Sequence, residues 1–229
     1  MATLFRMGLV VTFSALLLSG CSARVKNVAD TAKTALFGHQ DVVLTTEQVN
    51  DYPYAAAYIK TDHFPQAVAV LDRVSDQQRV YRTGAEESIT VRLGRILTSS
   101  GVPGMPLYTS NWQSDPLACH VQQQHMGTRQ LCPRHWQRDV EVGNYGENDV
   151  TRQTVQSSFM VGEKQSYQHP DGTDLTVTTI IERGSVADHS FENQFYTVAG
   201  RVVYARQWVS PKIGYAIWRE MKPFSGDLN

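Results

Sequence analysis

Alternation of apolar and polar residues dominates the chain from residue 54 onward. It is clearest at residues 66–71 and 174–180, and a period of two is typical of half-buried strands. Turn residues such as Asp171-Gly172 and Ala199-Gly200 separate such segments. Further strands are predicted at residues 88–98, 139–143, 151–161, 191–198, 201–209 and 213–221.

The order of these segments predicts an all-β fold. No pattern of helical length lies between the strands, so parallel βαβ units are not expected. The prediction is mainly antiparallel, as a sandwich or a partly closed barrel, with a short N-terminal helix. No repeat or low-complexity linker divides residues 41–229, which we expect to form a single β-rich domain.

Two helical signals precede the strands. Apolar residues recur near a period of 3.6 at residues 25–36 and stop at Gly38, which predicts a short amphipathic helix. Its role is either a spacer at the membrane surface or packing on the main domain. Thr45 and Gln48 have the spacing of a capping box, which predicts one or two helical turns before Pro53.

The first 21 residues have the pattern of a lipoprotein signal. Arg6 precedes an apolar run over residues 7–18, which as a helix would span only about 18 Å, and Ser19-Gly20-Cys21 follows. We predict that residues 1–20 are a signal peptide removed before Cys21, whose thiol takes a diacylglycerol. The alternative is an ordinary signal peptide with an incidental cysteine.

The predicted lipid on Cys21 decides where the protein resides. Several acyl chains such as palmitate hold a protein on a membrane essentially permanently, and residues 21–40 would form the lipidated N-terminus with its short helix. Ser22 follows the cysteine where Asp would signal retention in the inner membrane. The prediction is therefore a lipid anchor in the outer membrane, with the body facing the periplasm.

Composition excludes two classes of protein. Hydrophobic residues make up 41% of the 229 residues and charged residues 19%, which is incompatible with a disordered chain. Lysine and arginine number 21 against 22 acidic residues, so no basic excess is available for a phosphate backbone. Nucleic acid is not expected as a partner.

Cys119 and Cys132 are the remaining cysteines, and in an oxidising compartment they predict a disulfide. Four prolines and three glycines between residues 99 and 138 predict a segment poor in regular structure. A metal site is the alternative, because three histidines lie in or beside this loop: His120, His125 and His135. Their spacing matches no common zinc pattern, so we expect no metal.

No catalytic motif is present. The chain has neither a Gly-x-Ser-x-Gly elbow nor a His-Glu-x-x-His helix, and adjacent residues such as Asp188-His189-Ser190 point to opposite faces of a strand. We predict a protein that is not an enzyme and uses no cofactor. Aromatic rings can stack on sugars, and the candidates for saccharide or partner contact are Tyr108, Trp112, Trp136 and Trp208, with core packing as the alternative.

An ordered series of phrases carries a family resemblance. They are Asn27-Val28-Ala29-Asp30, Ala35-Leu36-Phe37-Gly38, Asp41-Val42 through Thr46-Glu47-Gln48-Val49, Tyr52-Pro53-Tyr54-Ala55, Gly94-Arg95-Ile96-Leu97-Thr98-Ser99-Ser100-Gly101, Gly200-Arg201-Val202-Val203 and Arg206-Gln207-Trp208-Val209-Ser210-Pro211. Over nearly all of the mature length the chain resembles the group 4 capsule polysaccharide lipoproteins (GfcB/YjbF-like, YmcC-like). The resemblance implies a mostly β fold, residence at the outer membrane and participation in making or exporting capsule or exopolysaccharide. It supplies no catalytic residue.

The functional prediction is a non-enzymatic accessory in capsule or exopolysaccharide assembly or export. Its candidate partners are the membrane through Cys21, envelope proteins of a polysaccharide export system including an outer-membrane β-barrel, and the polysaccharide itself. Two alternatives stay open. One is a carrier that encloses an amphiphile or glycolipid in a half-open barrel. The other is a polysaccharide-modifying enzyme.

Overall fold

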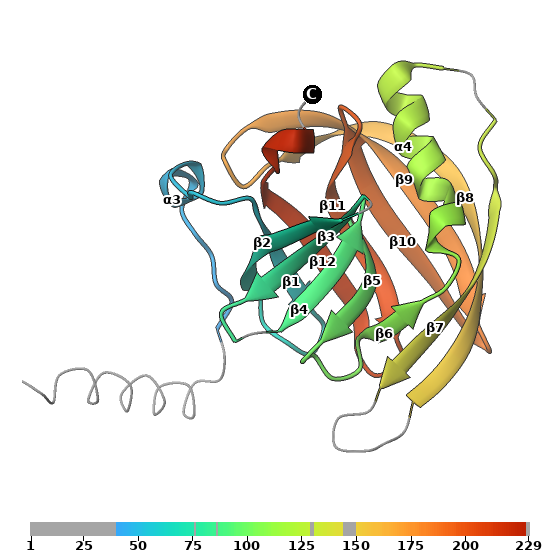
Figure 1. Ribbon diagram of the computed structural model, residues 1–229. Coiled ribbons are helices and arrows are strands. Elements are labelled where there is room, and N and C mark those ends of the chain that lie inside the picture. The colour runs from blue at the N-terminus through green and yellow to red at the C-terminus, as the bar shows by residue number, and fades with distance from the viewer. Residues whose placement is uncertain (1–39, 76, 86, 129–130, 144–149, 228–229) are drawn as a thin grey trace, which may run out of the picture. The chain divides into compact units, whose positions relative to one another are not determined.

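The computed structural model describes residues 40–75, 77–85, 87–128, 131–143 and 150–227 (Figure 1). Within these ranges twelve antiparallel strands form one sheet in the order β5-β4-β3-β2-β1-β12-β11-β10-β9-β8-β7-β6. The strands are β1 (Ala56–Thr61), β2 (Ala67–Ser75), β3 (Gln78–Thr83), β4 (Ser88–Arg92), β5 (Arg95–Ser100), β6 (Pro106–Thr109), β7 (His135–Gly143), β8 (Val150–Gln168), β9 (Asp174–Val186), β10 (His189–Val198), β11 (Arg201–Ser210) and β12 (Gly214–Lys222).

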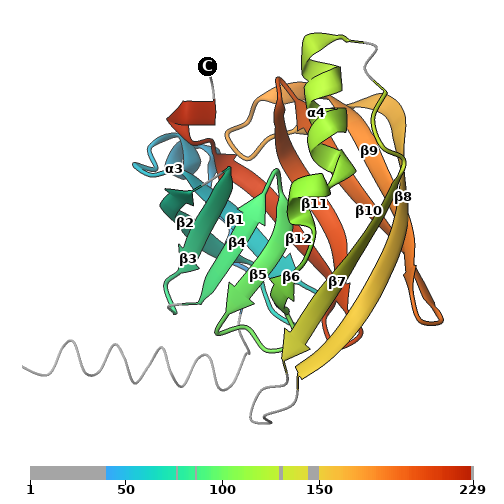
Figure 2. The same ribbon diagram turned by 45° about the vertical axis from the view of Figure 1, so that its right-hand side comes forward.

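The sheet curls until its two ends, β5 and β6, lie side by side in a nearly closed barrel (Figure 2). Side-chain hydroxyls bridge this seam: Ser99 Oγ donates to Pro106 O at 3.2 Å, and Thr109 Oγ1 donates to Leu97 O at 2.7 Å. The predicted all-β, partly closed barrel is confirmed. The N-terminal helix predicted at residues 25–36 lies outside the described residues.

Gln207 on β11 satisfies the free backbone edge of β5 from inside the barrel. Its Oε1 accepts from Ile96 N at 3.0 Å, and its Nε2 donates to Gly94 O at 2.7 Å. An edge strand with free N–H and C=O groups is a template for pairing with another chain. The buried amide removes part of that edge without a further strand.

The interior of the barrel is a packed core. Alternate residues of the strands point inward, as on β7, where Trp136, Arg138, Val140 and Val142 are buried. Residues from most of the strands, among them Ile59, Phe195 and Trp218, join in one apolar cluster. The lumen is therefore filled by side chains.

The capping box at Thr45 is confirmed. Helix α3 (Thr46–Asn50) begins after Thr45, whose Oγ1 accepts from Gln48 N while Gln48 Oε1 accepts from Thr45 N at 2.9 Å. Its one buried residue, Val49, packs in a small cluster with Tyr58 and Met221.

Removing this cap gives a local test of how α3 is held. Thr45→Ala is expected to lower the free energy of unfolding by about 1 kcal/mol, because an orphan N–H of the first turn loses its acceptor. Urea denaturation measures the change, and Thr46→Ala, at the next position with no capping bond, is the control. Equal losses in the two variants would contradict a capping role.

The segment at residues 99–138 has more regular structure than predicted. Besides β6 and the 3₁₀ turn η1 (Trp112–Ser114), it contains helix α4 (Pro116–Met126). A second 3₁₀ turn, η2 (Ser225–Asp227), follows β12. Asp115 caps α4 by accepting from Leu117 N at 2.9 Å, Pro116 occupies the first turn, and Gly127 ends the helix with φ +62°. The expectation of an irregular loop is wrong because these end signals are present and tertiary contacts hold the helix between them.

The strand predicted at residues 88–98 is a hairpin. Leu93 and Gly94 have φ values of +49° and +71°, and they turn the chain between β4 and β5. A Cβ atom at Gly94 would lie 2.8 Å from Val202 Cγ1, so the turn packs closely against β11. This turn brings Arg92 and Arg95 to the end of the barrel next to α4.

Candidate functional site

A cavity of about 260 Å³ lies between α4 and one end of the barrel. Residues of the β2–β3, β4–β5 and β10–β11 turns line it together with Ala118 and Val121 of α4 and the end of β12. Helix α4 runs along this end of the barrel in both views (Figures 1 and 2). We call this space the α4 cavity.

Two aromatic side chains form part of the apolar wall, beside aliphatic residues such as Val91 and Val121. Tyr81 of β3 and Trp218 of β12 meet edge to face, with ring centroids 6.3 Å apart. Both are buried, and Trp218 Nε1 has no hydrogen-bond acceptor among the described residues. Aromatic walls with a polar handle suit ligands that have both apolar and polar faces, as sugars have.

Five charged side chains line the same space. Arg79 pairs with Asp227, and Arg201 Nε donates to Glu220 Oε1 at 2.9 Å. Arg92 has no ion pair among the described residues. With three arginines and two carboxylates, the wall carries a net charge of +1 when all five are ionised.

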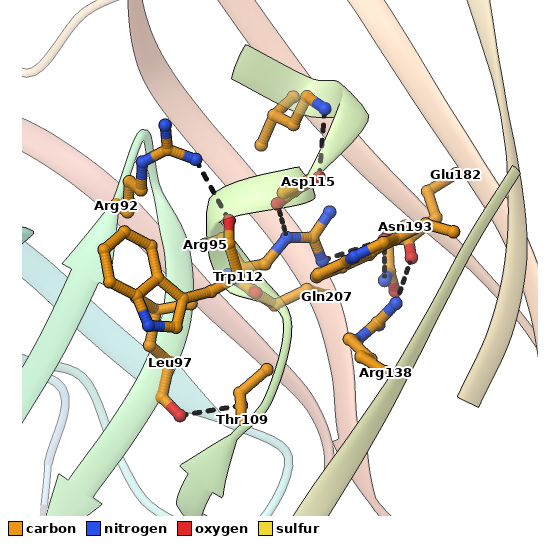
Figure 3. A network of polar contacts seen from close by, with 12 residues as sticks. Arg92, Arg95, Leu97, Thr109, Trp112, Asp115, Arg138, Glu182, Asn193 and Gln207 are labelled. Atoms are coloured by element: carbon orange, nitrogen blue, oxygen red, sulfur yellow. Dashed lines mark hydrogen bonds and ion pairs between the residues drawn. The ribbon is translucent and has the colours of Figure 1, made fainter. Parts of the chain in front are cut away.

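Trp112 positions Arg92 at this site. Arg92 Nη1 donates to Trp112 O at 3.1 Å, and the guanidinium carbon lies 5.5 Å from the centroid of the indole (Figure 3). The second Nη donates to Oε1 of Gln77, an exposed turn residue, at 2.9 Å. Both acceptors are neutral, so Arg92 is held without a direct ion pair.

Glu220 makes the charge of the wall depend on pH. Burial raises the pKa of Glu220 to about 7, although the ion pair with Arg201 opposes this shift. His169, whose pKa is lowered by burial, has its Nε2 at 3.7 Å from Glu220 Oε1. Protonation of Glu220 below neutral pH therefore adds positive charge to the α4 cavity.

A buried ionic network lies beside the N-terminus of α4 (Figure 3). Glu182 is fully buried and accepts from Arg138 Nη1 at 2.7 Å through Oε1, and from Arg95 Nη1 at 2.9 Å through Oε2. Arg95 also pairs with Asp115, the residue that caps α4. We call these four residues the Glu182 network.

The Glu182 network is balanced in charge and supplied with hydrogen bonds. Asn193 Nδ2 donates to Glu182 Oε2 at 2.8 Å, and its Oδ1 accepts from Trp208 N at 2.7 Å. Burial acts to raise the pKa of Glu182, but Arg138 and Arg95 outweigh it and lower the pKa to about 2. The network thus fixes the start of α4 to the barrel interior, with Glu182 ionised at neutral pH.

Trp136 is not positioned to contact a saccharide, which corrects that prediction, whereas Trp208 lines a pocket and stays a candidate. Trp136 is 4% exposed, and the guanidinium carbons of Arg138 and Arg95 lie 4.2 and 4.8 Å from its ring centroid. Trp208 is 8% exposed and stacks with Phe191 and His189. Neighbouring cations cover the ring of Trp136, whereas Trp208 lines a pocket together with His189 and Pro211.

The two other aromatic candidates lie apart from each other. Tyr108 on β6 is about half exposed, and it does not line the α4 cavity. Trp112 is half-buried, and its ring packs against the guanidinium of Arg92 without itself lining the α4 cavity. Sequence reasoning did not single out Tyr81, Arg92 or Glu220, because nothing local connects them: they meet only through the curl of the sheet.

The disulfide expected between Cys119 and Cys132 is present, with an S–S distance of 2.07 Å. It links α4 to the segment that leads into β7. The thiolates are therefore not available as metal ligands, His120 is buried beside Phe159, and His135 is exposed. Within the described ranges no group of three or more metal-ligating side chains converges.

Comparison with protein families finds one whose model matches most of the chain. The family described as "Group 4 capsule polysaccharide lipoprotein gfcB, YjbF" matches residues 29–217. The chain belongs to this family. Its members are lipoproteins by name, and no helix in the described part of the chain is long and apolar enough to cross a membrane.

Two relatives in the capsule lipoprotein family share less than 30% sequence identity with this chain. The chain is 25% identical to the uncharacterized lipoprotein GfcB of Escherichia coli K12 over 109 residues, 48% of this chain and 51% of GfcB. It is 29% identical to the uncharacterized lipoprotein YjbF of the same organism over 102 residues, 44% of this chain and 48% of YjbF. The matched regions thus span about half the length of these relatives.

A solved structure shares the fold. The crystal structure of the hypothetical lipoprotein YmcC from Escherichia coli K12 superposes with a TM-score of 0.68 at 18% identity, over 85% of this chain and 95% of YmcC. At this identity the similarity shows the barrel architecture alone.

Proposed function

We propose that this protein is a non-enzymatic accessory lipoprotein of capsule or exopolysaccharide assembly or export. Cys21 anchors it in the outer membrane, and its body faces the periplasm and contacts the polymer or a protein of the export system. Membership of the capsule lipoprotein family supports the process. The observation that carries a binding role is the α4 cavity, whose wall combines buried aromatic rings with three arginines.

The cavity favours a polar ligand over an acyl chain. Its wall contains Arg79, Arg92, Arg201, Glu220 and Asp227, and covering charged groups with hydrocarbon is costly. The barrel interior beyond it is occupied by the apolar core and the Glu182 network. These features support a saccharide contact more strongly than a lipid carrier.

The state of the carboxylates supports binding over hydrolysis. Glycoside hydrolysis uses one carboxyl group as the acid and a second as nucleophile or base. In the α4 cavity Glu220 is paired with Arg201 and Asp227 with Arg79, so both carboxylates are held by cations of the wall. We propose that they position the arginines.

The role of the anchor can be tested with Cys21→Ala. The variant is expected to leave the membrane fraction, because the acyl chains that stabilise insertion by about 0.8 kcal/mol per CH₂ are gone. Polymer output is expected to fall, because the tether no longer concentrates the body near its membrane-embedded partner. Fractionation with immunoblotting and quantification of surface polysaccharide measure the two effects.

Ser22→Ala is the matched control, since it changes the neighbouring residue and keeps the thiol. Ser22→Asp tests the address itself and is expected to move the protein to the inner-membrane fraction on a density gradient. Normal polymer output from a soluble, unlipidated Cys21→Ala protein would refute the tethering role. Crosslinking in intact cells would then identify the envelope proteins that contact the body.

A further inference from the structure

The wall of the α4 cavity is richer in hydrogen-bond donors than in acceptors. Arg79 Nε, Arg92 Nε and Trp218 Nε1 are buried N–H groups without an acceptor among the described residues. No side-chain oxygen in the described part of the chain is buried without a donor. The unsatisfied polar groups of this wall are therefore all donors, which favours a ligand that brings acceptors.

Arg92 adds a charge requirement. It is the arginine of the wall that forms no ion pair with a described carboxylate, and its Nη groups are held by a backbone carbonyl and by the side chain of Gln77. A ligand carboxylate would replace the amide of this exposed turn residue with an acceptor that is itself ionised, so that both partners of the hydrogen bond carry charge. The planar guanidinium also fits both oxygens of a carboxylate.

The size of the cavity limits the ligand. About 260 Å³ is slightly below the range of about 300–1,000 Å³ that is typical of pockets for drug-sized molecules. The cavity suits a single ring with its substituents, and the edge-to-face pair of Tyr81 and Trp218 supplies an apolar surface on one side. An isolated inorganic anion would leave that surface unused.

We infer that the α4 cavity binds an acidic sugar unit, a pyranose that carries a carboxylate, with Arg92 pairing the carboxylate and the Tyr81–Trp218 pair packing against the ring. This inference rests on the proposed role in polysaccharide assembly or export and names the class of sugar. It also assigns Trp112 a positioning role, because that residue holds the guanidinium of Arg92 at the wall.

Calorimetric titration of the full-length lipidated protein in detergent tests the inference. Trigalacturonate is the acidic probe and maltotriose the neutral probe of equal length. We expect trigalacturonate to bind at least tenfold more tightly than maltotriose, and Arg92→Gln to weaken its binding at least tenfold, the loss expected for one hydrogen bond between charged groups. Arg92→Lys keeps the charge but loses the planar fork, so its affinity for trigalacturonate is expected to lie between that of the unaltered protein and that of Arg92→Gln.

Arg82→Gln is the matched control. Arg82 is exposed on β3 next to Tyr81, and alternation along the strand points it to the opposite face. Its titration is expected to match that of the unaltered protein within twofold. Equal affinity for both trisaccharides, no binding of either, equal losses in the Arg92 and Arg82 variants, or displacement of trigalacturonate by acetate at equimolar concentration would each overturn the inference.

These outcomes separate the inference from the proposed function. If acidic sugars do not bind but Cys21→Ala still lowers polymer output, the inference fails and the accessory role stands. If trigalacturonate binds through Arg92 but Cys21→Ala exports polymer normally, the ligand class stands and the tethered accessory role fails.

Discussion

Replacing Glu182 with alanine is expected to lower the free energy of unfolding by about 3–5 kcal/mol. The substitution leaves the guanidinium groups of Arg95 and Arg138 buried without the carboxylate that both share, and breaking a buried ion pair from one side costs about that much. It also removes the acceptor of Asn193 Nδ2. Urea unfolding followed by tryptophan fluorescence measures the loss.

Two further variants separate the charge of Glu182 from its shape. Glu182→Gln keeps the volume and an acceptor oxygen, so it is expected to lose less than Glu182→Ala. Arg183→Gln breaks the neighbouring pair with Glu192, which is exposed, and is expected to cost less than 1 kcal/mol. A Glu182→Ala protein within 1 kcal/mol of the unaltered chain would contradict a stabilising network.

The pH dependence gives a second measure of the same group. The native pKa of Glu182 is about 2, below the ordinary value of 4.5, so its ionised form stabilises the fold above pH 4.5. That contribution is lost as the pH falls from 4.5 through 2. Glu182→Gln has no such proton to take up, and its unfolding free energy should fall less steeply over this window.

Several of the strands that sequence predicted, such as β7 and β10, alternate between buried and more exposed positions. The missed strands lack that contrast. β1 is buried at nearly every position, so its residues do not alternate, and β3 carries two arginines among its six residues. β6 is only four residues long and begins with proline. Pairing with neighbouring strands, rather than their own hydrophobic pattern, determines the position of β1, β3 and β6 in the sheet.

Helix α4 was missed for a related reason. Its apolar stripe is narrow, with Leu117 and Val121 as its buried aliphatic side chains, and so its period is weak. The sequence contains a helix start signal at Asp115-Pro116 and an end signal at Gly127. The stability of the helix between them also depends on the ion pair between Asp115 and Arg95 and on the disulfide, which the sequence signals do not show. Local signals alone did not separate this helix from a loop.

The candidate site was hidden because its residues are far apart in the chain. Arg92, Trp218 and Glu220 come together only when β12 pairs with β1 and the sheet curls. The search for aromatic residues near the predicted loop selected Trp136. The buried guanidinium groups of Arg95 and Arg138 pack on its ring and cover it. The sequence shows where the aromatic residues are, but whether an aromatic side chain is exposed depends on which side chains the fold packs against it.

Removing the disulfide with Cys119→Ser and Cys132→Ser together is expected to lower the free energy of unfolding by about 3 kcal/mol. Closing a loop with a sequence separation of 13 restricts the unfolded chain by about that amount on the chain-entropy estimate. Thermal unfolding of the double variant, compared with the unaltered protein with and without reductant, measures the effect. Reductant should destabilise the unaltered protein and leave the double variant unchanged.

The native state of the double variant should loosen unevenly along α4. Asp115 still binds Arg95 and still caps the N-terminus, so the first turn keeps its anchor. Cys119, in the first half of the helix, loses its covalent link to the segment before β7. Residues 121–126 lie beyond Cys119 and away from the Asp115 cap, so their amide hydrogen exchange should accelerate more than that of residues 117 and 118. Uniform acceleration along α4 would show that the Glu182 network does not hold the helix independently of the disulfide. Because Val121 and Gln122 line the α4 cavity, the loosened end should also weaken trigalacturonate binding without any change at Arg92.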